Sequence, residues 1–235
     1  MNIHGLQKMT LLDFPGHVAC TVFLAGCDMR CPFCHNYDLA CGKSDFVMSD
    51  AELIDFLVKR KGLLEGVAFT GGEPCLHKDL PDLIRRIRDL GFAVKLDTNG
   101  CHPDLLRDIL REGLIEYAAM DIKNSPGKYA LTCGLQELDL NPVLESISIL
   151  LESRIDYEFR TTVVREFHEA SDFEEIGAMI QGARHYFLQS FTDRDTVPFE
   201  GFHAPSAGEM LEFADIVRPY VDDVRLRGVE NASEE

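Results

Sequence analysis

The stretch Ala25-Gly26-Cys27-Asp28-Met29-Arg30-Cys31-Pro32-Phe33-Cys34-His35-Asn36 carries three cysteines in a C-x3-C-x2-C spacing. An ordinary 4Fe–4S cube binds a protein thiolate at every iron, whereas this loop supplies only Cys27, Cys31 and Cys34. One iron would therefore stay open to a ligand that is not protein. Such an open iron is a place for chemistry and not only for carrying an electron.

The same three thiolates, together with His35, also form a common zinc set of three Cys and one His. Zinc knuckles usually arrive as two ligand pairs separated by a longer loop, and the sequence has no second C-x-x-C. The spacing favours the iron–sulfur cluster. A structural zinc-binding interaction module remains open as the alternative.

Outward from this loop, short apolar runs alternate with helical periodicity. We predict strands at residues 17–24, 66–70, 92–97, 116–122, 156–164 and 185–190, with an extra strand at 224–227 and a short one at 9–12. Several runs are apolar on both faces, as buried parallel strands are. The alternation predicts an α/β fold, a parallel sheet curled into a partial (β/α)6 TIM-like barrel.

Caps and breakers mark the helices between these strands. Capping boxes are predicted at Ser49 with Glu52, Ser171 with Glu174 and Ser206 with Glu209. Other helices are expected to begin at Pro103 and at Asn141-Pro142, and to stop at Gly91 and Gly113. No linker divides the chain, so we predict a single domain over 1–228, with an N-terminal extension at 1–16 and a flexible acidic tail at 229–235.

Polar residues gather where the predicted strands end. These residues are Gly71-Gly72-Glu73-Pro74, Asp97-Thr98-Asn99-Gly100, Asp121-Ile122-Lys123 and Gln189-Ser190. Barrel enzymes build their sites at the carboxyl ends of the strands, and the cysteine loop follows such an end as well. The candidate chemistry is therefore expected on one face.

Composition excludes several classes of partner. The 235 residues carry a net charge of −17, from 23 basic and 40 acidic side chains, which argues against nucleic acid and against anionic lipid surfaces. The sequence has no apolar run long enough to span a membrane and no signal-peptide pattern. The chain is rich in apolar residues and has three of its eight cysteines in one short loop, which differs from small disulfide-bonded scaffolds. We therefore expect a cytoplasmic protein with reduced cysteines.

Together these motifs resemble the radical S-adenosylmethionine (SAM) superfamily, and within it the activating enzymes of glycyl radical proteins. The resemblance is closest to the longer branch of anaerobic ribonucleoside-triphosphate reductase activating proteins. It rests on residues 9–16, the cysteine loop, Phe69-Thr70-Gly71-Gly72-Glu73-Pro74, Asp97-Thr98-Asn99-Gly100 and Met120-Asp121-Ile122-Lys123. It is dense over residues 6–125 and weaker beyond.

The resemblance implies a role for each matching residue. Cys27, Cys31 and Cys34 would hold three irons of a [4Fe-4S] cluster, and the amino and carboxylate groups of SAM would chelate the fourth. The implied SAM contacts are Phe33, His35 and Leu188 near the adenine, Gly71, Gly72 and Glu73 near the methionyl group, and Asp97, Thr98, Asp121, Lys123 and Arg160 beside it. A monovalent cation near these acids is also allowed. Purely structural roles for these residues also stay open: core packing for Phe33, a simple turn for Gly71-Gly72, a helix or turn cap for Asp97, and a solvated ion pair for Asp121 and Lys123.

The implied activity is reductive cleavage of SAM, followed by removal of a glycine Cα hydrogen from a partner enzyme. The expected partners are a glycyl radical enzyme, most closely anaerobic ribonucleoside-triphosphate reductase, and a flavodoxin or ferredoxin as electron donor. Another glycyl radical enzyme, formate-lyase-like, or a small molecule is the alternative substrate. The other five cysteines lack ligand spacing and are expected to be core residues, so electrons must come from outside. Phe191 stands about where formate-lyase activases carry a histidine.

Overall fold

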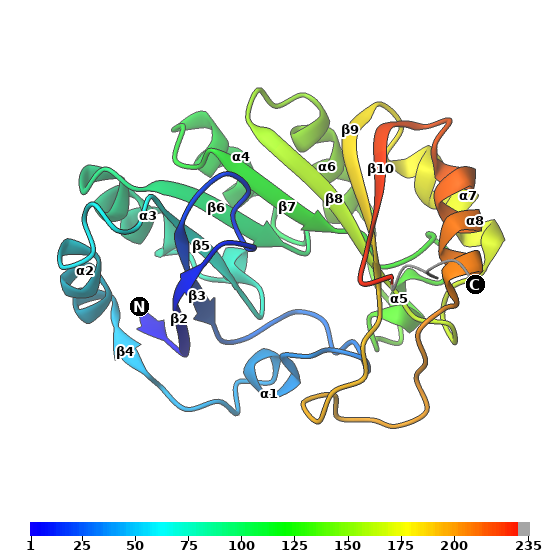
Figure 1. Ribbon diagram of the computed structural model, residues 1–235, viewed down its shortest axis with the longest axis horizontal. Helices are drawn as coiled ribbons and strands as arrows, with labels where there is room; N and C mark the ends of the chain where they lie inside the picture. The colour runs from blue at the N-terminus through cyan, green and yellow to red at the C-terminus, as the bar shows by residue number, and fades with distance from the viewer. Residues whose placement is uncertain (230–235) are drawn as a thin grey trace, which may run out of the picture.

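An eight-stranded sheet forms the frame of the protein in a computed structural model that describes residues 1–229 (Figure 1). Its order is β10-β9-β8-β7-β6-β5-β3-β2, and every neighbouring pair is parallel except β2 with β3. The strands are β2 Gly5–Thr10, β3 Ala19–Leu24, β5 Gly66–Gly71, β6 Ala93–Thr98, β7 Tyr117–Asp121, β8 Asp156–Val163, β9 Ala183–Ser190 and β10 Val221–Arg227.

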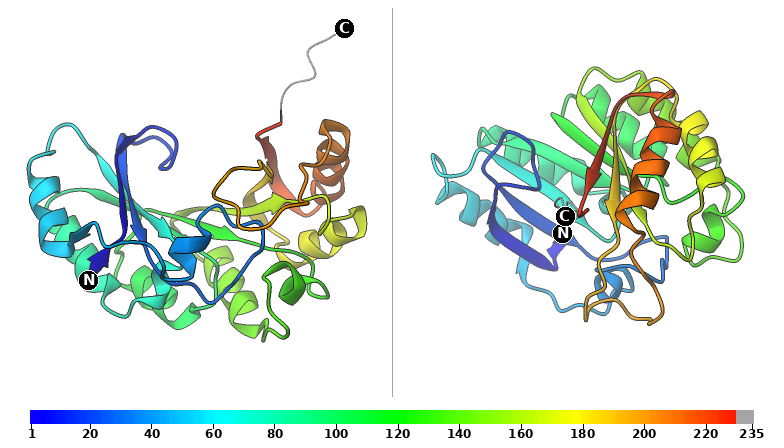
Figure 2. Two further views of the ribbon diagram at one scale, coloured as in Figure 1. Left: turned by 90° about the horizontal axis from the view of Figure 1, so that it is seen from below. Right: turned by 45° about the vertical axis from the view of Figure 1, so that its right-hand side comes forward.

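The sheet is curved, and its two edge strands, β2 and β10, rise on opposite sides of an open interior (Figure 2). Six strands from β3 to β9 make the predicted (β/α)6 series, and β10 is the predicted extra strand. The partial TIM-like barrel expected from the alternation is therefore confirmed. The open side matters for function because it leaves a lateral way into the interior.

Helices cover the convex face of the sheet, and the strand residues beneath them are apolar and buried (Figure 1). The helices are α1 Tyr37–Ala40, α2 Asp50–Val58, α3 Leu80–Asp89, α4 Pro103–Arg111, α5 Tyr129–Thr132, α6 Asn141–Leu151, α7 Ala170–Met179 and α8 Ala207–Val217, with a 3-10 turn at Pro74–Leu76. The capping boxes at Ser49 and Ser206 are both formed as predicted. Within residues 1–229, no helix is both long and apolar enough to cross a bilayer.

Two sequence predictions were wrong in detail. The strand expected at residues 9–12 is instead β2, which runs from Gly5 to Thr10 and ends there because the Thr10 hydroxyl accepts the N–H groups of Leu12 and Asp13 and turns the chain. The predicted cap at Ser171 lies inside α7.

The helix α7 instead begins at Ala170, after Glu169, whose N–H donates to Asp172 at 2.9 Å. Asp172 also accepts from Ser125 and Lys128, and these bonds fix the helix start two residues early. At the opposite end of the chain, β1 Asn2–Ile3 pairs with β4 Met48–Ser49 in a separate small sheet. Of the predicted acidic tail, residues 230–235 lie outside the described part of the chain.

Candidate active site

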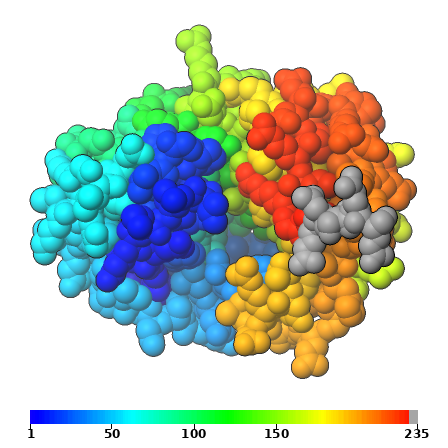
Figure 3. All heavy atoms as spheres, in the orientation of Figure 1, coloured from blue at the N-terminus to red at the C-terminus, as the bar shows by residue number. Residues whose placement is uncertain are grey.

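A cavity of about 490 Å³ lies at the carboxyl ends of the parallel strands. In the space-filling view it is the hollow between the N-terminal segment and strand β10 (Figure 3). All three loop cysteines line it, as do Phe33, His35, Gly71, Gly72, Asp97, Thr98, Asp121, Lys123 and Arg160. The structure therefore brings all of the predicted site residues to one cavity except Glu73 and Leu188.

The cysteine loop, residues 25–36, joins β3 to α1 and is held by the end of β5. The N–H of Gly72 donates to the Leu24 carbonyl at 2.8 Å, and the N–H of Glu73 donates to the Gly26 carbonyl at 2.7 Å. A Cβ atom added at Gly72 would lie 1.9 Å from the Gly26 oxygen. The glycine at 72 is thus required by the approach of the loop backbone, and its place near the methionyl group of SAM stays a prediction.

The chemistry of the donor set suits an iron–sulfur cluster. The three thiols are free and share one cavity, and Cys27 Sγ already accepts two N–H groups, from Met29 N at 3.4 Å and Asn99 Nδ2 at 3.6 Å. The neighbouring buried Cys133 thiol lowers the pKa of Cys31 to about 7, which favours the thiolate that a metal binds. Burial raises the pKa of Cys27 to about 11, so binding there would release a proton.

The zinc alternative needs His35 as its fourth ligand. The Nε2–H of His35 instead donates to the Thr192 carbonyl at 2.6 Å, and its ring stacks on Phe191 with an interplanar angle of 3°. The cavity-lining thiols therefore fit a cluster better than a single zinc ion.

An aromatic wall stands beside the last cysteine. Phe33 is buried and packs against Phe167 and Phe191, with ring centroids 5.6 and 6.4 Å away. Both Phe33 and His35 nonetheless keep part of their surface on the cavity. Phe191, just after β9, stacks on the His35 ring, so the phenylalanine that departs from the formate-lyase activases has a packing role here.

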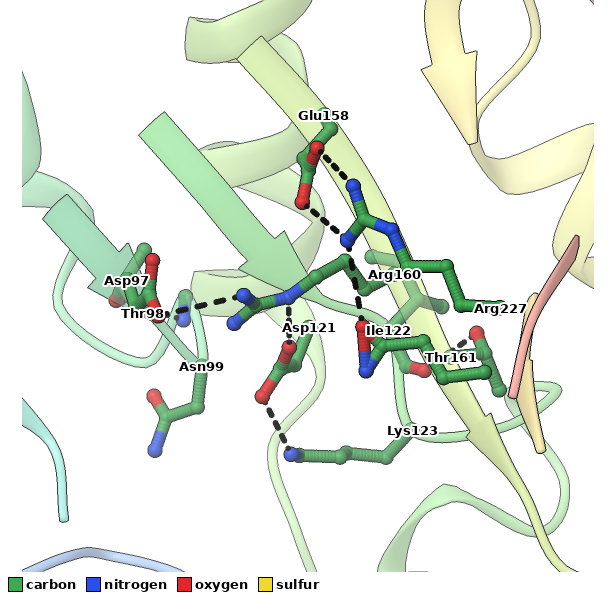
Figure 4. A network of polar contacts seen from close by, with 12 residues as sticks. Asp97, Thr98, Asn99, Asp121, Ile122, Lys123, Glu158, Arg160, Thr161 and Arg227 are labelled. Carbon is green, nitrogen blue, oxygen red and sulfur yellow. Dashed lines mark hydrogen bonds and ion pairs between the residues drawn. The ribbon is translucent and has the colours of Figure 1, made fainter. Parts of the chain in front are cut away.

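A row of five charged side chains lies along the wall of the cavity (Figure 4 labels all of them but the first): Lys95 and Asp97 on β6, Arg160 on β8, Asp121 at the end of β7 and Lys123 just after it. We call it the charged row. Arg160 lies at its centre, with Nε 2.8 Å from Asp121 Oδ1 and Nη1 3.3 Å from Asp97 Oδ2. The row holds three cations and two anions, so it presents a surplus positive charge to whatever occupies the cavity.

The charges in this row stabilise one another. Burial alone would favour neutral carboxyls, but Arg160 with Lys95 lowers the pKa of Asp97, and Arg160 with Lys123 lowers that of Asp121. Burial opposes the charge on Lys123 as well, yet Asp121 and Cys31 outweigh it and raise its pKa well above the usual value. Asp97, Asp121, Lys123 and Arg160 are thus ionised at neutral pH. Because Asp97 and Asp121 already have side-chain cations as partners, the monovalent cation stays a prediction.

Glu73 lies behind the cavity and not on its surface. Its carboxylate is fully buried and accepts three hydrogen bonds, from Cys75 N at 2.8 Å, Thr98 Oγ1 at 2.8 Å and Asn99 N at 2.6 Å. Burial, which those bonds do not fully offset, raises its pKa. Leu188 is fully buried in β9 and likewise does not line the cavity. Direct contacts of Glu73 and Leu188 with SAM stay predictions.

Several side chains that line the cavity were not among the predicted site residues, including Lys95, Glu158 and Arg227, and Asn99 was named only as part of a motif. Arg227 reaches from β10 to Glu158 on β8, with Nη1 and Nη2 at 2.9 and 3.0 Å from its two carboxylate oxygens (Figure 4). A signal for two of them was available, since Lys95 and Glu158 are buried charged residues that lie between apolar neighbours in their strands. Buried charges of this kind are paired or functional.

Comparison with known proteins agrees with this geometry. The sequence pattern of the Radical SAM superfamily matches residues 21–180, more than half of the chain, and the chain belongs to that superfamily. Its members use a [4Fe-4S] cluster and SAM. A crystal structure of a radical SAM methyltransferase from Sphaerobacter thermophilus shares the fold, with a TM-score of 0.68 and 17% identity over 93% of this chain and 68% of that one.

Relatives by sequence narrow the group. The MJ1227 protein of Methanocaldococcus jannaschii, named among the glycyl-radical enzyme activating enzymes, is 30% identical over 99% of this chain and 98% of its own length. A pyruvate formate-lyase-activating enzyme from Clostridium pasteurianum is 32% identical over 52% of each chain. The present chain thus spans about half of that second relative and nearly all of the first, and within the superfamily it groups with these activating enzymes.

Proposed function

We propose that this protein is an activase that cleaves SAM reductively and removes a Cα hydrogen from a glycine of a glycyl radical enzyme. The finer proposal is that this partner is anaerobic ribonucleoside-triphosphate reductase. The observation that carries the activity is the single cavity that contains all three loop thiols, the charged row and an opening between β2 and β10. Full-length similarity to MJ1227 supports the class of partner.

The bound cluster and SAM supply the radical chemistry, namely one-electron cleavage that gives methionine and a 5′-deoxyadenosyl radical. The protein holds the cluster with Cys27, Cys31 and Cys34. Arg160 and Lys123 place positive charge where the SAM carboxylate is expected, and Asp97 and Asp121 place negative charge where its ammonium is expected. The aromatic wall excludes water from the adenine side.

The substrate is expected to enter from the open side of the sheet. The cavity extends past the proposed SAM contacts to Gln7 and Leu12 near β2 and to Glu158 and Arg227 on the opposite side. A flexible loop carrying the target glycine can reach this space without the partner unfolding. The expected electron donor is an external flavodoxin or ferredoxin.

The test is anaerobic reconstitution with iron and sulfide, followed by dithionite and SAM. We expect iron and sulfide to bind, 5′-deoxyadenosine to form, and a glycyl radical signal to appear by electron paramagnetic resonance on added anaerobic ribonucleoside-triphosphate reductase. Cys34→Ser should abolish all three, whereas Cys41→Ser, outside the cavity, should leave them unchanged.

The outcomes separate the levels of the proposal. Purified protein that binds zinc without iron or sulfide would overturn it entirely. A radical formed only on a formate-lyase-like partner would overturn the finer proposal and keep the activase. SAM cleavage stimulated by a small molecule and by neither protein would overturn the glycyl radical assignment.

A further inference from the structure

Asn99 lies in the loop after β6 and is almost fully buried, with 5% of its surface exposed. Its backbone N–H and both ends of its side-chain amide have partners. Its backbone N–H donates to Glu73 Oε2 at 2.6 Å, its Oδ1 accepts from Cys101 N at 2.9 Å, and its Nδ2 lies 3.6 Å from Cys27 Sγ. This residue therefore connects the buried glutamate to the first cysteine of the loop.

The orientation of the Asn99 amide follows from these partners. The two ends of an asparagine amide are distinguished by their hydrogen bonds. Since the Cys101 N–H is a donor, the atom facing it must be the oxygen, and the NH2 group must face Cys27. The side-chain N–H of Asn99 then points at Cys27 Sγ. This sulfur becomes a thiolate ligand when the cluster binds, and a thiolate accepts a hydrogen bond more strongly than a thiol does.

We propose that Asn99 is a positioning residue that raises the reduction potential of the cluster through its hydrogen bond to Cys27 Sγ. Reduction adds one negative charge to the cluster and its sulfur ligands, so a donor to a ligand sulfur stabilises the reduced state more than the oxidised state. Glu73 accepts the backbone N–H of Asn99, and the Cys101 N–H donates to its side-chain oxygen. The Nδ2 donor is therefore already held in place in the oxidised state. The inference requires the cluster but not the glycyl radical partner.

The experiment compares the reconstituted full-length protein with Asn99→Leu, Asn99→Asp and Ser146→Ala. Leucine keeps the shape without a donor. Aspartate keeps the acceptor for Cys101 N–H but replaces the donor facing Cys27 with a negative charge. Ser146→Ala is the matched control, because the Ser146 hydroxyl holds the same loop through Gly100 O at 2.7 Å without involving Cys27.

The readout is a potentiometric titration followed by the electron paramagnetic resonance signal of the reduced cluster. At a fixed ambient potential we expect Asn99→Leu to lower the ratio of reduced to oxidised cluster by about tenfold, equivalent to about 59 mV for a one-electron couple. Asn99→Asp should lower it further, and Ser146→Ala should match wild type. Unchanged midpoints in Asn99→Leu and Asn99→Asp proteins that retain their iron and sulfide would overturn the proposal.

A second readout separates potential from structure. If Asn99 acts through the potential, Asn99→Leu should cleave SAM slowly with a weak reductant and recover with a stronger one such as Ti(III) citrate. If neither Asn99 variant retains iron, Asn99→Ser provides a smaller change in the same place. A rate that stays low with every reductant, in protein with a full cluster, would assign Asn99 a structural role only and refute the inference.

Discussion

Replacing Gly72 with alanine tests the connection between β5 and the cysteine loop. The new Cβ would lie 1.9 Å from the Gly26 oxygen and 2.7 Å from its carbonyl carbon, whereas real Cβ contacts essentially never fall below 3.0 Å. Both obstacles are backbone atoms, so a side-chain rotation cannot relieve them. The loop must therefore move by about 1 Å or more, from 1.9 Å to at least 3.0 Å.

The cost follows from what this movement breaks. It separates the two hydrogen bonds from Gly72 N and Glu73 N to the loop, each with a net value of about 1 kcal/mol. Overpacking adds about 1–3 kcal/mol. We expect Gly72→Ala to lose about 3–5 kcal/mol in the free energy of unfolding, or to keep its fold with the loop displaced and the cluster lost.

Two measurements on each protein decide between these results: urea unfolding of the reduced apoprotein followed by circular dichroism, and iron and sulfide content after anaerobic reconstitution. Gly127→Ala is the matched control, since nothing lies within 4 Å of a Cβ there and its φ is not positive. That control should stay within about 1 kcal/mol of wild type. A Gly72→Ala protein with wild-type stability and a full cluster would refute the reasoning.

Three further predictions concern buried polar groups. Arg160→Leu removes the central cation of the charged row and leaves Asp97 and Asp121 with one cation each, so unfolding experiments should show a loss of about 3 kcal/mol; a loss below 0.5 kcal/mol would contradict it. Glu73→Gln turns an NH2 group toward donors and should cost about 1–3 kcal/mol, and an unchanged urea midpoint would count against it. Burial lowers the pKa of His168, so the neutral ring stabilises the fold above about pH 6.5. Stability should then fall as the pH drops below that value, with a shallower slope in His168→Phe; equal slopes would disprove this role.

The sequence alone predicted the elements that local chemistry determines. Apolar runs located the parallel strands, and Ser49 and Ser206 located two helix starts through caps that act within one turn. It did not predict the start of α7, because Asp172 is fixed by Ser125 and Lys128, more than 40 residues earlier in the chain. Contacts over that separation carry no signal in a pattern read along the chain.

The same distinction holds in the site. The C-x3-C-x2-C spacing identified the three thiols, since ligand number and spacing lie in one short loop. Cys133 looked like an isolated core cysteine, and only the fold places it against Cys31. Arg227 meets Glu158 across an intervening strand, from β10 to β8, so their pairing depends on the curvature of the sheet. Nothing in either strand alone indicates that curvature.

The position of Glu73 changes the interpretation of the Gly-Gly-Glu motif. The Glu73 carboxylate is fully buried, and its oxygens accept hydrogen bonds from the Thr98 hydroxyl and the Asn99 N–H at the next strand end. Its own N–H binds the Gly26 carbonyl of the cysteine loop. One buried residue thus joins three segments that all line the cavity, and a change at Glu73 should shift the cluster loop and the β6 loop together. Through these hydrogen bonds, the Gly-Gly-Glu motif fixes the position of the cysteine loop relative to the charged row.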